Sequence, residues 1–558
     1  MGAGIGRTRR AIDTSSTMAN HKFAVIADAH VHPLNADFGV RDRNGLCMRS
    51  WADTRKSTRV FNESEGAFSA ALDRLKEQGF LNVVLLGDYT DDGQRRTTDA
   101  VVAMLEEREE QDGFRFFALP GNHDTFGAEQ RDHTKMFLDA LGQPRSVSSM
   151  DGAGEFHDPA MASDPHPVGV MKMAQFGYMP RDGDLLWETP FGSDPSVQAR
   201  QYICSSADRK VALTFFDASY LVEPVKGIWL LMIDANVFEP TGQGNEVFGS
   251  SNAGWNAMLR VKPFIRDWMQ DVAERAKANG KTLLTFSHYP MVDPYRDYDC
   301  AEETLFGATA MAMRRPTPET SRALCETGIG LHFSGHLHVR RRTEVVHKGQ
   351  QLQNVAVPSP VAYPPSLAVI EVSSAETRVS DLRFDDHQVD PCLRTGYETE
   401  AKAEGEALDN AHHAPSYGAF LWEHCSALVP HRYLPKEWPD SRAKEVLSGS
   451  LSQALAWVKP EQTLDLQRDF ALLDVVADWY RIRAAGALAL EDLPSERFDA
   501  YQTLRSHLSS SDSKCERARF WTLFLTRLCD FCDDALQERG DFTLGDAQLR
   551  KRCAPEQV

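Results

Sequence analysis

The chain has 558 residues, of which 42% are hydrophobic and 25% charged, as in an ordinary globular protein. This length exceeds the size at which a single hydrophobic core usually stops growing, so two domains are expected. The formal net charge of −19 excludes a protein that coats nucleic acid, because no excess of lysine and arginine exists to displace counterions from phosphates. A small phosphorylated substrate is compatible with this charge, since bound divalent cations can reverse the local sign.

Three features of the chain indicate where the protein works. No apolar run is long enough to span a bilayer, so no membrane association is expected. Residues 1–20 contain arginine, serine and threonine but no apolar stretch, which indicates a disordered extension rather than a secretory signal. Ten cysteines are too few for a disulfide framework in a chain of this length. We therefore expect a cytoplasmic protein with reduced thiols.

Short apolar runs alternate with helical patterns in the first half of the chain. The expected strands lie at residues 23–27, 83–86, 116–119, 228–233 and 282–286. Helical spacing of apolar residues predicts helices around residues 68–75, 101–105 and 264–278, the first ended by Gly79 and the last by Gly280. Strands that alternate with helices in this way indicate a layered α/β sheet.

The pattern changes twice farther along the chain. Beyond Gly335, three strands with no helices between them indicate a second, partly antiparallel sheet, and they are expected at residues 352–357, 367–372 and 377–384. From about residue 391 the patterns are long, polar-faced and helical, at residues 403–412, 418–428, 443–457, 464–484 and 515–537. This composition predicts a C-terminal all-α domain.

These patterns divide the chain into three parts. Residues 1–20 are the extension, residues 21–390 an α/β domain, and residues 391–558 the helical domain. Within the α/β domain, residues 125–226 form an insert rich in glycine, proline, aspartate and aromatic residues. A loop region of this length in a compact domain usually serves as a lid or as the wall of a binding site.

Five short motifs with metal-binding side chains stand at the ends of expected strands. They are Asp28-Ala29-His30, Gly87-Asp88 through Gly93, Gly121-Asn122-His123-Asp124, Ser287-His288-Tyr289-Pro290 and Gly335-His336-Leu337-His338. Together they offer carboxylate, imidazole and amide oxygen ligands, which a two-metal hydrolytic site can combine. Two divalent ions about 3.5–4 Å apart can hold a hydroxide between them and polarise a phosphoryl group. Mixed oxygen and imidazole ligands suit Mn, Fe or Zn better than Mg or Ca.

The order and residue types of these motifs resemble the calcineurin-like metallophosphoesterase superfamily over roughly residues 23–384. The second and third motifs are most similar to those of bacterial class III cyclic nucleotide phosphodiesterases. Residues 218–234 are similar to larger members that carry a helical C-terminal domain. The resemblance implies a four-layer α-β-β-α sandwich, here followed by the all-α domain.

The resemblance also implies which residues bind two divalent or trivalent metal ions. The first ion would be held by Asp28, His30 and His338. The second ion would be held by Asn122, His288 and His336, and the carboxylate of Asp88 would bridge the two ions. All motif positions of the family are filled in this sequence. The catalytic machinery is therefore expected to be complete.

Two further residues receive catalytic roles from the same resemblance. His123 would face the scissile phosphate, where it stabilises negative charge or protonates the leaving oxygen, and Asp124 would orient its imidazole. Asp91 and Asp92 are expected to form the turn or to support the ligands indirectly. His32 is a candidate for contact with the substrate phosphate, and a solvated loop histidine is an equally good interpretation.

The leading hypothesis is a phosphodiesterase that acts on a small, cyclic nucleotide-like molecule with a metal-bridging hydroxide as nucleophile. A phosphomonoesterase on the same site is the alternative, because the metal ligands do not distinguish the two substrates. A scaffold protein is less consistent with a complete ligand set, although the helical domain is a candidate surface for homo-oligomerisation. The segment Asp28 to His32 also resembles the first strand of amidohydrolase and PHP-type barrels, which leaves the motifs at 121–124 and 335–338 unexplained.

Overall fold

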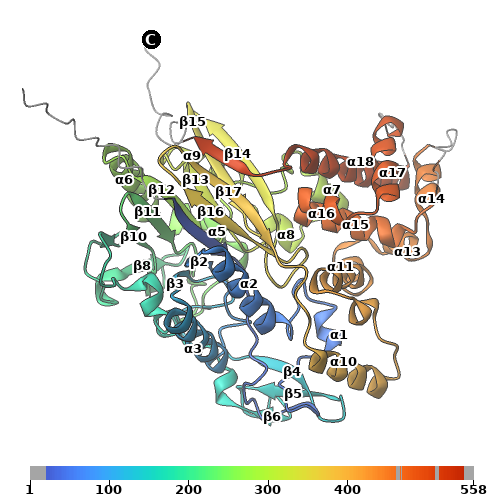
Figure 1. Ribbon diagram of the computed structural model, residues 1–558, viewed down its shortest axis with the longest axis horizontal. Helices are drawn as coiled ribbons and strands as arrows, with labels where there is room; N and C mark the ends of the chain where they lie inside the picture. The colour runs from blue at the N-terminus through green and yellow to red at the C-terminus, as the bar shows by residue number, and fades with distance from the viewer. Residues whose placement is uncertain (1–19, 460–465, 467, 509–514, 546–558) are drawn as a thin grey trace, which may run out of the picture.

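The computed structural model describes residues 20–459, 466, 468–508 and 515–545 (Figure 1). The extension expected over residues 1–20 therefore falls, apart from Asn20, outside the described residues. Two β-sheets lie face to face at the centre of the molecule, and most of the C-terminal helices are grouped on one side of them. Among the described helices, none combines the length and apolar content that a membrane crossing requires.

The first sheet has six strands in the order β18-β17-β16-β1-β2-β3. Its strands are β1 (His21–Ile26), β2 (Asn82–Leu86), β3 (Arg115–Leu119), β16 (Ser366–Val372), β17 (Glu376–Arg383) and β18 (Phe542–Gly545). The first three are parallel, and β16 runs antiparallel to β1. Its outer face is covered by α2 (Ser64–Gln78) and α3 (Arg95–Asp112). As expected, α2 ends at Gly79, which has a φ of 76°.

The second sheet has seven strands in the order β14-β15-β13-β12-β11-β10-β7. They are β7 (Trp187–Glu188), β10 (Tyr220–Val225), β11 (Ile228–Ile233), β12 (Thr282–Ser287), β13 (Leu331–Ser334), β14 (Arg341–His347) and β15 (Gln350–Ala356). Side chains alternate across β11: Leu230 and Met232 join the core between the sheets, whereas Leu231 and Ile233 pack with α6 (Pro263–Ala278). This alternation produces the expected four-layer α-β-β-α sandwich.

Smaller elements complete the sandwich and its insert. The chain also forms α5 (Gly254–Val261), which packs against α6, α8 (Ala310–Met313), and α9 (Pro318–Cys325), which packs against β14 and β15. The helix α7 (Ala301–Phe306) packs instead against the long C-terminal helix α18 (Glu516–Gln537). The insert forms a small sheet of β4 (Thr134–Leu138), β5 (Pro144–Ser148) and β6 (Phe156–His157), the short helix α4 (Val168–Met171), and a hairpin of β8 (Gln201–Ser205) and β9 (Ala212–Phe216). It is therefore a folded unit rather than an open loop.

The C-terminal region is helical, as expected. Its helices are α10 (Pro391–Glu404), α11 (Tyr417–Leu428), α12 (Leu434–Glu437), α13 (Asp440–Ser448), α14 (Leu451–Val458), α15 (Leu472–Ala485), α16 (Ala487–Asp492), α17 (Ser495–His507) and α18 (Glu516–Gln537). The strand β18 then pairs antiparallel with β17. The chain thus returns to the sandwich after the helices and extends its first sheet.

Three expectations about these elements were wrong. The strands expected beyond Gly335 do not share one sheet, because β15 pairs with β13 whereas β16 pairs with β1. The helix expected at 403–412 is interrupted because Gly405, with a φ of 71°, ends α10. The helix expected at 443–457 is two helices, since Ser450 caps α14 by accepting from the backbone N–H of Gln453. Part of the helix expected at 464–484 falls outside the described residues.

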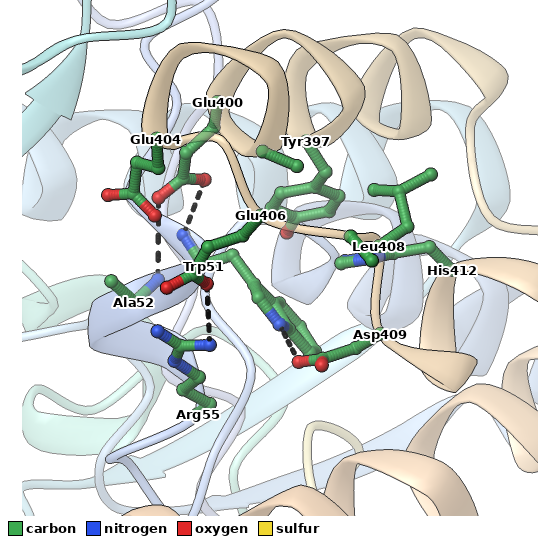
Figure 2. Close-up of a pocket in the computed structure, with 12 residues that line it drawn as sticks. Trp51, Ala52, Arg55, Tyr397, Glu400, Glu404, Glu406, Leu408, Asp409 and His412 are labelled. Carbon is green, nitrogen blue, oxygen red and sulfur yellow. Dashed lines mark hydrogen bonds and ion pairs between the residues drawn. The ribbon is translucent and has the colours of Figure 1, made fainter.

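The short helix α1 (Trp51–Thr54) attaches the helical region to the sandwich. Trp51 donates its backbone N–H to Glu400 of α10 at 2.8 Å and its indole N–H to Asp409. Arg55 forms an ion pair with Glu406 at 3.2 Å. Figure 2 shows these acidic side chains turned toward Trp51 and Arg55. Glu400, Asp409 and Glu406 therefore bind α1 and the residue after it to the helical region.

A buried ion pair joins the helices to the second sheet's side of the sandwich. Arg483 of α15 donates through Nε and Nη2 to the carboxylate of Glu302 on α7, at 2.9 and 2.6 Å. Arg483→Leu is expected to lower the free energy of unfolding by about 3–5 kcal/mol, because it leaves the Glu302 charge buried without a partner. Urea denaturation checks this result. The control Arg322→Leu, which breaks an exposed pair with Glu319, should cost no more than about 1 kcal/mol.

A second link at this interface makes stability depend on pH. Glu63, at the start of α2, accepts a hydrogen bond from Tyr397 Oη of α10 at 2.7 Å, and burial raises the pKa of its carboxyl group to about 7. Because the folded-state pKa is raised, the stability that the protonated group confers is complete below about pH 4.5 and is lost as the pH rises through 7.

Glu63→Gln is therefore expected to gain stability relative to the wild type, by roughly 1–3 kcal/mol, when the pH is raised from 5 to 8. The measurement compares urea unfolding of the two proteins at both pH values. A difference between them that stays constant with pH would contradict the assignment. Glu77→Gln, an exposed change on the same helix, should show no such dependence.

Candidate metal centre

The five motifs follow five strands that come from both sheets. Their first residues with metal-binding side chains (Asp28, Asp88, Asn122, His288 and His336) stand one to three positions after β1, β2, β3, β12 and β13. These strands are parallel within each sheet, so their carboxyl ends lie at a common edge. Local sequence thus places each side chain at a strand end, and the pairing of the two sheets brings the ends together.

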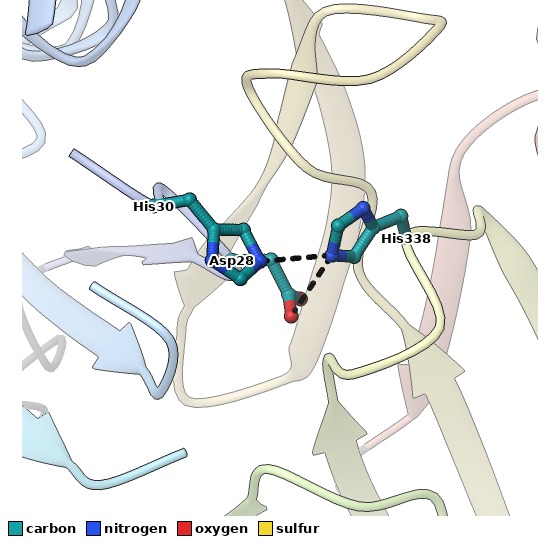
Figure 3. Close-up of side chains that lie close together, drawn as sticks. All are labelled: Asp28, His30 and His338. Carbon is teal, nitrogen blue, oxygen red and sulfur yellow. Dashed lines mark hydrogen bonds and ion pairs between the residues drawn. The ribbon is translucent and has the colours of Figure 1, made fainter. Parts of the chain in front are cut away.

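The first group consists of Asp28, His30 and His338 (Figure 3). The Nε2 atoms of His30 and His338 lie 3.0 Å apart, and His338 Nε2 lies 3.5 Å from Asp28 Oδ1. All three side chains are buried or nearly so. Burial lowers the pKa of His30 well below its usual value, so this ring is neutral and offers a lone pair.

The second group consists of Asp88, His288 and His336, with Asn122 beside it. His288 Nε2 lies 3.3 Å from Asp88 Oδ2 and 3.2 Å from Asn122 Oδ1. Backbone carbonyl groups hold the opposite nitrogens of both rings: His288 Nδ1 contacts Leu86 O at 2.9 Å, and His336 Nε2 contacts Ser251 O at 3.0 Å. Such contacts fix the ring tautomer and leave the other nitrogen free to bind a metal ion.

Asp88 joins the two groups. Its Oδ2 atom lies 3.3 Å from His288 Nε2 and 3.7 Å from His30 Nε2, and its Oδ1 accepts from the backbone N–H of His123 at 2.7 Å. Burial favours the neutral acid, but the neighbouring His288 and His123 outweigh it and hold the pKa of Asp88 well below its usual value. In return, although burial opposes it, Asp88 raises the pKa of His288 to about 9.

The spacing of these atoms fits metal coordination. Nitrogen and oxygen ligands at about 2.0–2.2 Å from one ion lie roughly 3.0–3.5 Å from each other. The separations within the two groups range from 3.0 to 3.5 Å along the pairs His30–His338, His338–Asp28, His288–Asp88 and His288–Asn122. The donor set of imidazole, carboxylate and amide oxygen suits a first-row transition metal. The residues present therefore fit a pair of ions that share Asp88.

The backbone at the site adopts an uncommon conformation. In the described part of the chain, nine non-glycine residues have a positive φ, and five of them belong to the two groups: Asp28, His30, Asp88, His336 and His338. Residues other than glycine rarely enter this region, and those that do cluster at functional sites. The fold therefore keeps these residues in a costly conformation that turns their side chains toward one another.

Two motif glycines are required by close packing against the ligands. A Cβ atom on Gly335 would lie 2.5 Å from Asp28 Oδ2, and one on Gly87 would lie 2.7 Å from His288 Nδ1. Gly87 also has a φ of 85°. Any side chain at these positions would displace Asp28 or His288. The glycines of these motifs are thus part of the geometry of the centre.

His123 lies beside the first group with 27% of its side chain exposed, and its ring centroid is 4.9 Å from that of His30. The carboxylate that contacts its ring is Asp92, at 2.5 Å from Nδ1, and not Asp124 as expected. Asp124 instead accepts from the backbone N–H groups of Gly121 and Thr90, at 2.9 and 3.0 Å. Asp124 therefore connects the loop of residues 121–124 to the loop that carries Thr90, and the imidazole of His123 is hydrogen-bonded to Asp92 instead.

The structure places His32 away from solvent, unlike either interpretation of the sequence. Its side chain is buried, its Nε2 atom contacts the carbonyl oxygen of Cys47 at 2.7 Å, and its ring stacks on Phe137. Burial lowers the pKa of His32 to about 4. A neutral, enclosed ring that is already hydrogen-bonded is not placed to contact a substrate phosphate. His32 serves to pack the motif loop against the insert.

Comparison with known families decides the classification. The family model described as calcineurin-like phosphoesterase matches residues 21–340, which is more than half of the chain. The chain belongs to this family. Members of this family are metal-binding hydrolases of phosphate esters, and this calcineurin-like phosphoesterase is therefore one of them. Comparison with curated protein sequences finds no match.

Similar solved structures include a dimetal phosphatase from Danio rerio, with 14% identity and a TM-score of 0.35 over 65% of this chain and 95% of that one. GAP50, the anchor in the inner membrane complex of Plasmodium, shows 12% identity and a TM-score of 0.27 over 66% and 87%. The phosphopantetheinyl hydrolase from Mycobacterium tuberculosis shows 13% identity and a TM-score of 0.24 over 61% and 91%.

Some residues near the centre of this phosphoesterase are not evident from the sequence. Lys135, from the insert strand β4, contacts both Asp91 and Asp92, and Arg59 forms an ion pair with Asp91 at 2.9 Å. Neither cation belongs to a motif. Only the folding of the insert and of the segment after α1 brings them to the loop that carries Asp88.

Proposed function

We propose that the protein is a two-metal phosphodiesterase that hydrolyses a phosphodiester of a small, cyclic nucleotide-like molecule. The observation that carries this proposal is the position of Asp88 between two groups of metal-ligand side chains, 3.3 Å from His288 and 3.7 Å from His30. A carboxylate so placed can bind two ions at once, and a two-metal centre suits in-line displacement at phosphorus. The resemblance of the motifs to cyclic nucleotide phosphodiesterases supports a diester substrate.

Bound ions of Mn, Fe or Zn would supply Lewis acidity and make a water molecule nucleophilic at neutral pH. The residues that would hold them are those expected from the sequence: Asp28, His30 and His338 for one ion, Asn122, His288 and His336 for the other, and Asp88 for both. The backbone carbonyl groups of Leu86 and Ser251 would keep two of the imidazoles in the binding orientation.

His123 would act on the substrate itself. Its Nδ1 is held by Asp92, so its Nε2 is the nitrogen left to meet the phosphate. The Asp92 carboxylate orients the ring, which in its protonated form can donate a proton from Nε2 to the oxygen that leaves phosphorus. Lys135 contacts Asp92 from the other side and holds that carboxylate in place. Asp124 takes no part in this step and maintains the loops that carry His123 and Asp88.

A substrate screen tests the proposal. The purified protein, loaded with Mn²⁺, is incubated with cyclic nucleotides, an aryl phosphodiester and an aryl phosphomonoester, and kcat/KM is measured for each. We expect hydrolysis of the diesters at a higher kcat/KM than that of the monoester. Exclusive hydrolysis of the monoester would establish the phosphomonoesterase alternative. Absence of hydrolysis with two equivalents of bound metal would contradict both and favour a scaffold.

A further inference from the structure

Three buried polar side chains beside the second ligand group are linked by hydrogen bonds, and we call them the supporting triad: Asn236, Tyr289 and Ser250. Tyr289 Oη lies 3.1 Å from Asn236 Oδ1 and 2.7 Å from Ser250 Oγ. Asn236 follows β11, Tyr289 follows β12, and Ser250 begins the short turn η4 (Ser250–Asn252). The supporting triad therefore connects three separate segments of the sandwich.

The direction of each hydrogen bond in the supporting triad is fixed by its neighbours. The side-chain amide of Asn236 donates to Pro120 O at 2.9 Å and to Gly121 O at 3.4 Å. Its Oδ1 atom is therefore the acceptor toward Tyr289. Tyr289 Oη thus donates to Asn236 and accepts from Ser250 Oγ. A buried network with one arrangement of donors and acceptors favours a single geometry of the side chains in it.

The supporting triad reaches Asn122 and His288 through the backbone. Asn236 binds the carbonyl oxygen of Gly121, which is the residue before Asn122. Tyr289 follows His288 directly, so the hydrogen bonds of its hydroxyl group restrain the loop that carries this imidazole. The positions of the amide ligand and of one histidine ligand thus depend on the same pair of side chains.

The supporting triad reaches His336 by two further contacts. The ring centroid of Tyr289 lies 4.6 Å from that of His336. Ser250 directly precedes Ser251, whose carbonyl oxygen contacts His336 Nε2 at 3.0 Å. The three ligands expected for the second ion alone are therefore all held by groups that the triad restrains.

The first ligand group is held by other neighbours. Among the described residues, no hydrogen bond or ring contact joins the supporting triad to Asp28, His30 or His338. Instead, Ser359 Oγ donates to the backbone carbonyl oxygen of Asp28 at 2.7 Å. The surroundings of the two groups can therefore be altered separately, which makes the contribution of the triad measurable.

A buried lysine anchors the supporting triad to the body of the sandwich. Lys262 Nζ donates to Asp217 Oδ2 and to the backbone carbonyl oxygen of Asp234, both at 2.9 Å. Asp234 Oδ1 in turn accepts from the backbone N–H of Asn236 at 3.1 Å. The side chains of Lys262, Asp217 and Asp234 are all buried, and breaking such a paired group leaves an uncompensated charge in the interior. The position of Asn236 is thus fixed by the core of the fold.

We propose that Asn236, Tyr289 and Ser250 are positioning residues that set the affinity of the second metal site and not that of the first. This inference rests on the two-metal centre of the proposed function. The three residues act on the ion through its ligands, whose orientation they fix. Groups that orient metal ligands typically contribute about 10–100-fold to metal affinity, because a ligand that is already in place loses less freedom when it binds.

Binding of Mn²⁺ to the metal-free, full-length protein tests this proposal. Equilibrium dialysis gives the two dissociation constants, and anomalous diffraction from crystals at a limiting Mn²⁺ concentration shows to which site each belongs. In Tyr289→Phe, we expect the dissociation constant of the site beside His336 to rise about 10–100-fold, while that of the site beside Asp28 stays the same. Asn236→Asp keeps the size of the side chain but loses its two N–H donors, and it should have the same effect.

Tyr501→Phe is the matched control, because it also removes the hydroxyl group of a buried tyrosine, which donates to Asp478 at 2.7 Å in the helical region. It should lower the midpoint of thermal unfolding, as Tyr289→Phe does, and leave both dissociation constants unchanged. An unchanged affinity of the second site, or an equal loss at both sites, would overturn the inference and leave the proposed function standing. If Tyr289→Phe does not fold, Asn236→Asp decides. A wild type that binds fewer than two equivalents of metal would overturn the proposed two-metal centre and this inference with it.

Discussion

Asp88→Asn is expected to abolish turnover and to reduce the bound metal from two equivalents to one or fewer. The side chain keeps its shape, but it loses the negative charge and one of the two oxygen ligands that would be shared between the ions. A decrease in kcat of about 10³-fold or more follows if both ions act on the phosphoryl group. Metal content by plasma mass spectrometry and kcat on an aryl phosphodiester are the measurements.

The control for this variant is Asp267→Asn, an exposed change on α6 that should leave both quantities unaltered. Two equivalents of tightly bound metal in Asp88→Asn would contradict a bridging role. Two equivalents of bound metal together with low turnover would indicate that Asp88 contacts the substrate instead. A thermal unfolding curve of the variant separates loss of metal from loss of fold.

His123→Ala is expected to keep both metal ions and to reduce turnover by ~10²–10⁴-fold, the usual contribution of a general acid. The ring lies beside the first ligand group, but its Nδ1 is bound to Asp92 rather than turned toward a ligand atom. The decrease should be smaller with a leaving group that needs no proton, such as 4-nitrophenolate, than with an alcohol. Comparing kcat for the two kinds of diester therefore distinguishes an acid from a residue that only positions the substrate.

His413→Ala, an exposed histidine of the helical region, is the matched control and should behave as the wild type. Turnover unchanged in His123→Ala would remove this residue from the mechanism. Loss of one metal equivalent would instead identify it as a ligand. Asp92→Asn should lower turnover less than His123→Ala, by about 10–100-fold, because it affects the ring only through one hydrogen bond.

The sequence predicted which side chains gather in the two groups, because these residues are local features of strand ends. Asp28, Asp88 and His288 each follow a buried apolar run, and parallel strands direct their carboxyl ends to one edge. The glycines around them were recognisable for the same reason, since close approach of a backbone to a ligand leaves no room for a side chain. The four-layer sandwich followed from the resemblance that these motifs carry.

Other features depend on contacts between distant segments and have no local signal. His123 is hydrogen-bonded to Asp92 rather than to Asp124 because of the way the loop of residues 87–93 packs against the loop of residues 121–124. The pairing of β16 with β1 rather than β15 joins strands that are more than 300 residues apart. Lys135 reaches Asp92 only because the insert packs against the sandwich.

Anomalous diffraction from crystals grown with Mn²⁺ is the most direct measurement of whether two ions share Asp88. The expected result is two anomalous peaks about 3.5–4 Å apart, one beside His30 and His338 and the other beside His288 and His336, with Asp88 between them. A single peak, or two peaks of which neither lies within coordination distance of Asp88, would contradict the two-metal centre.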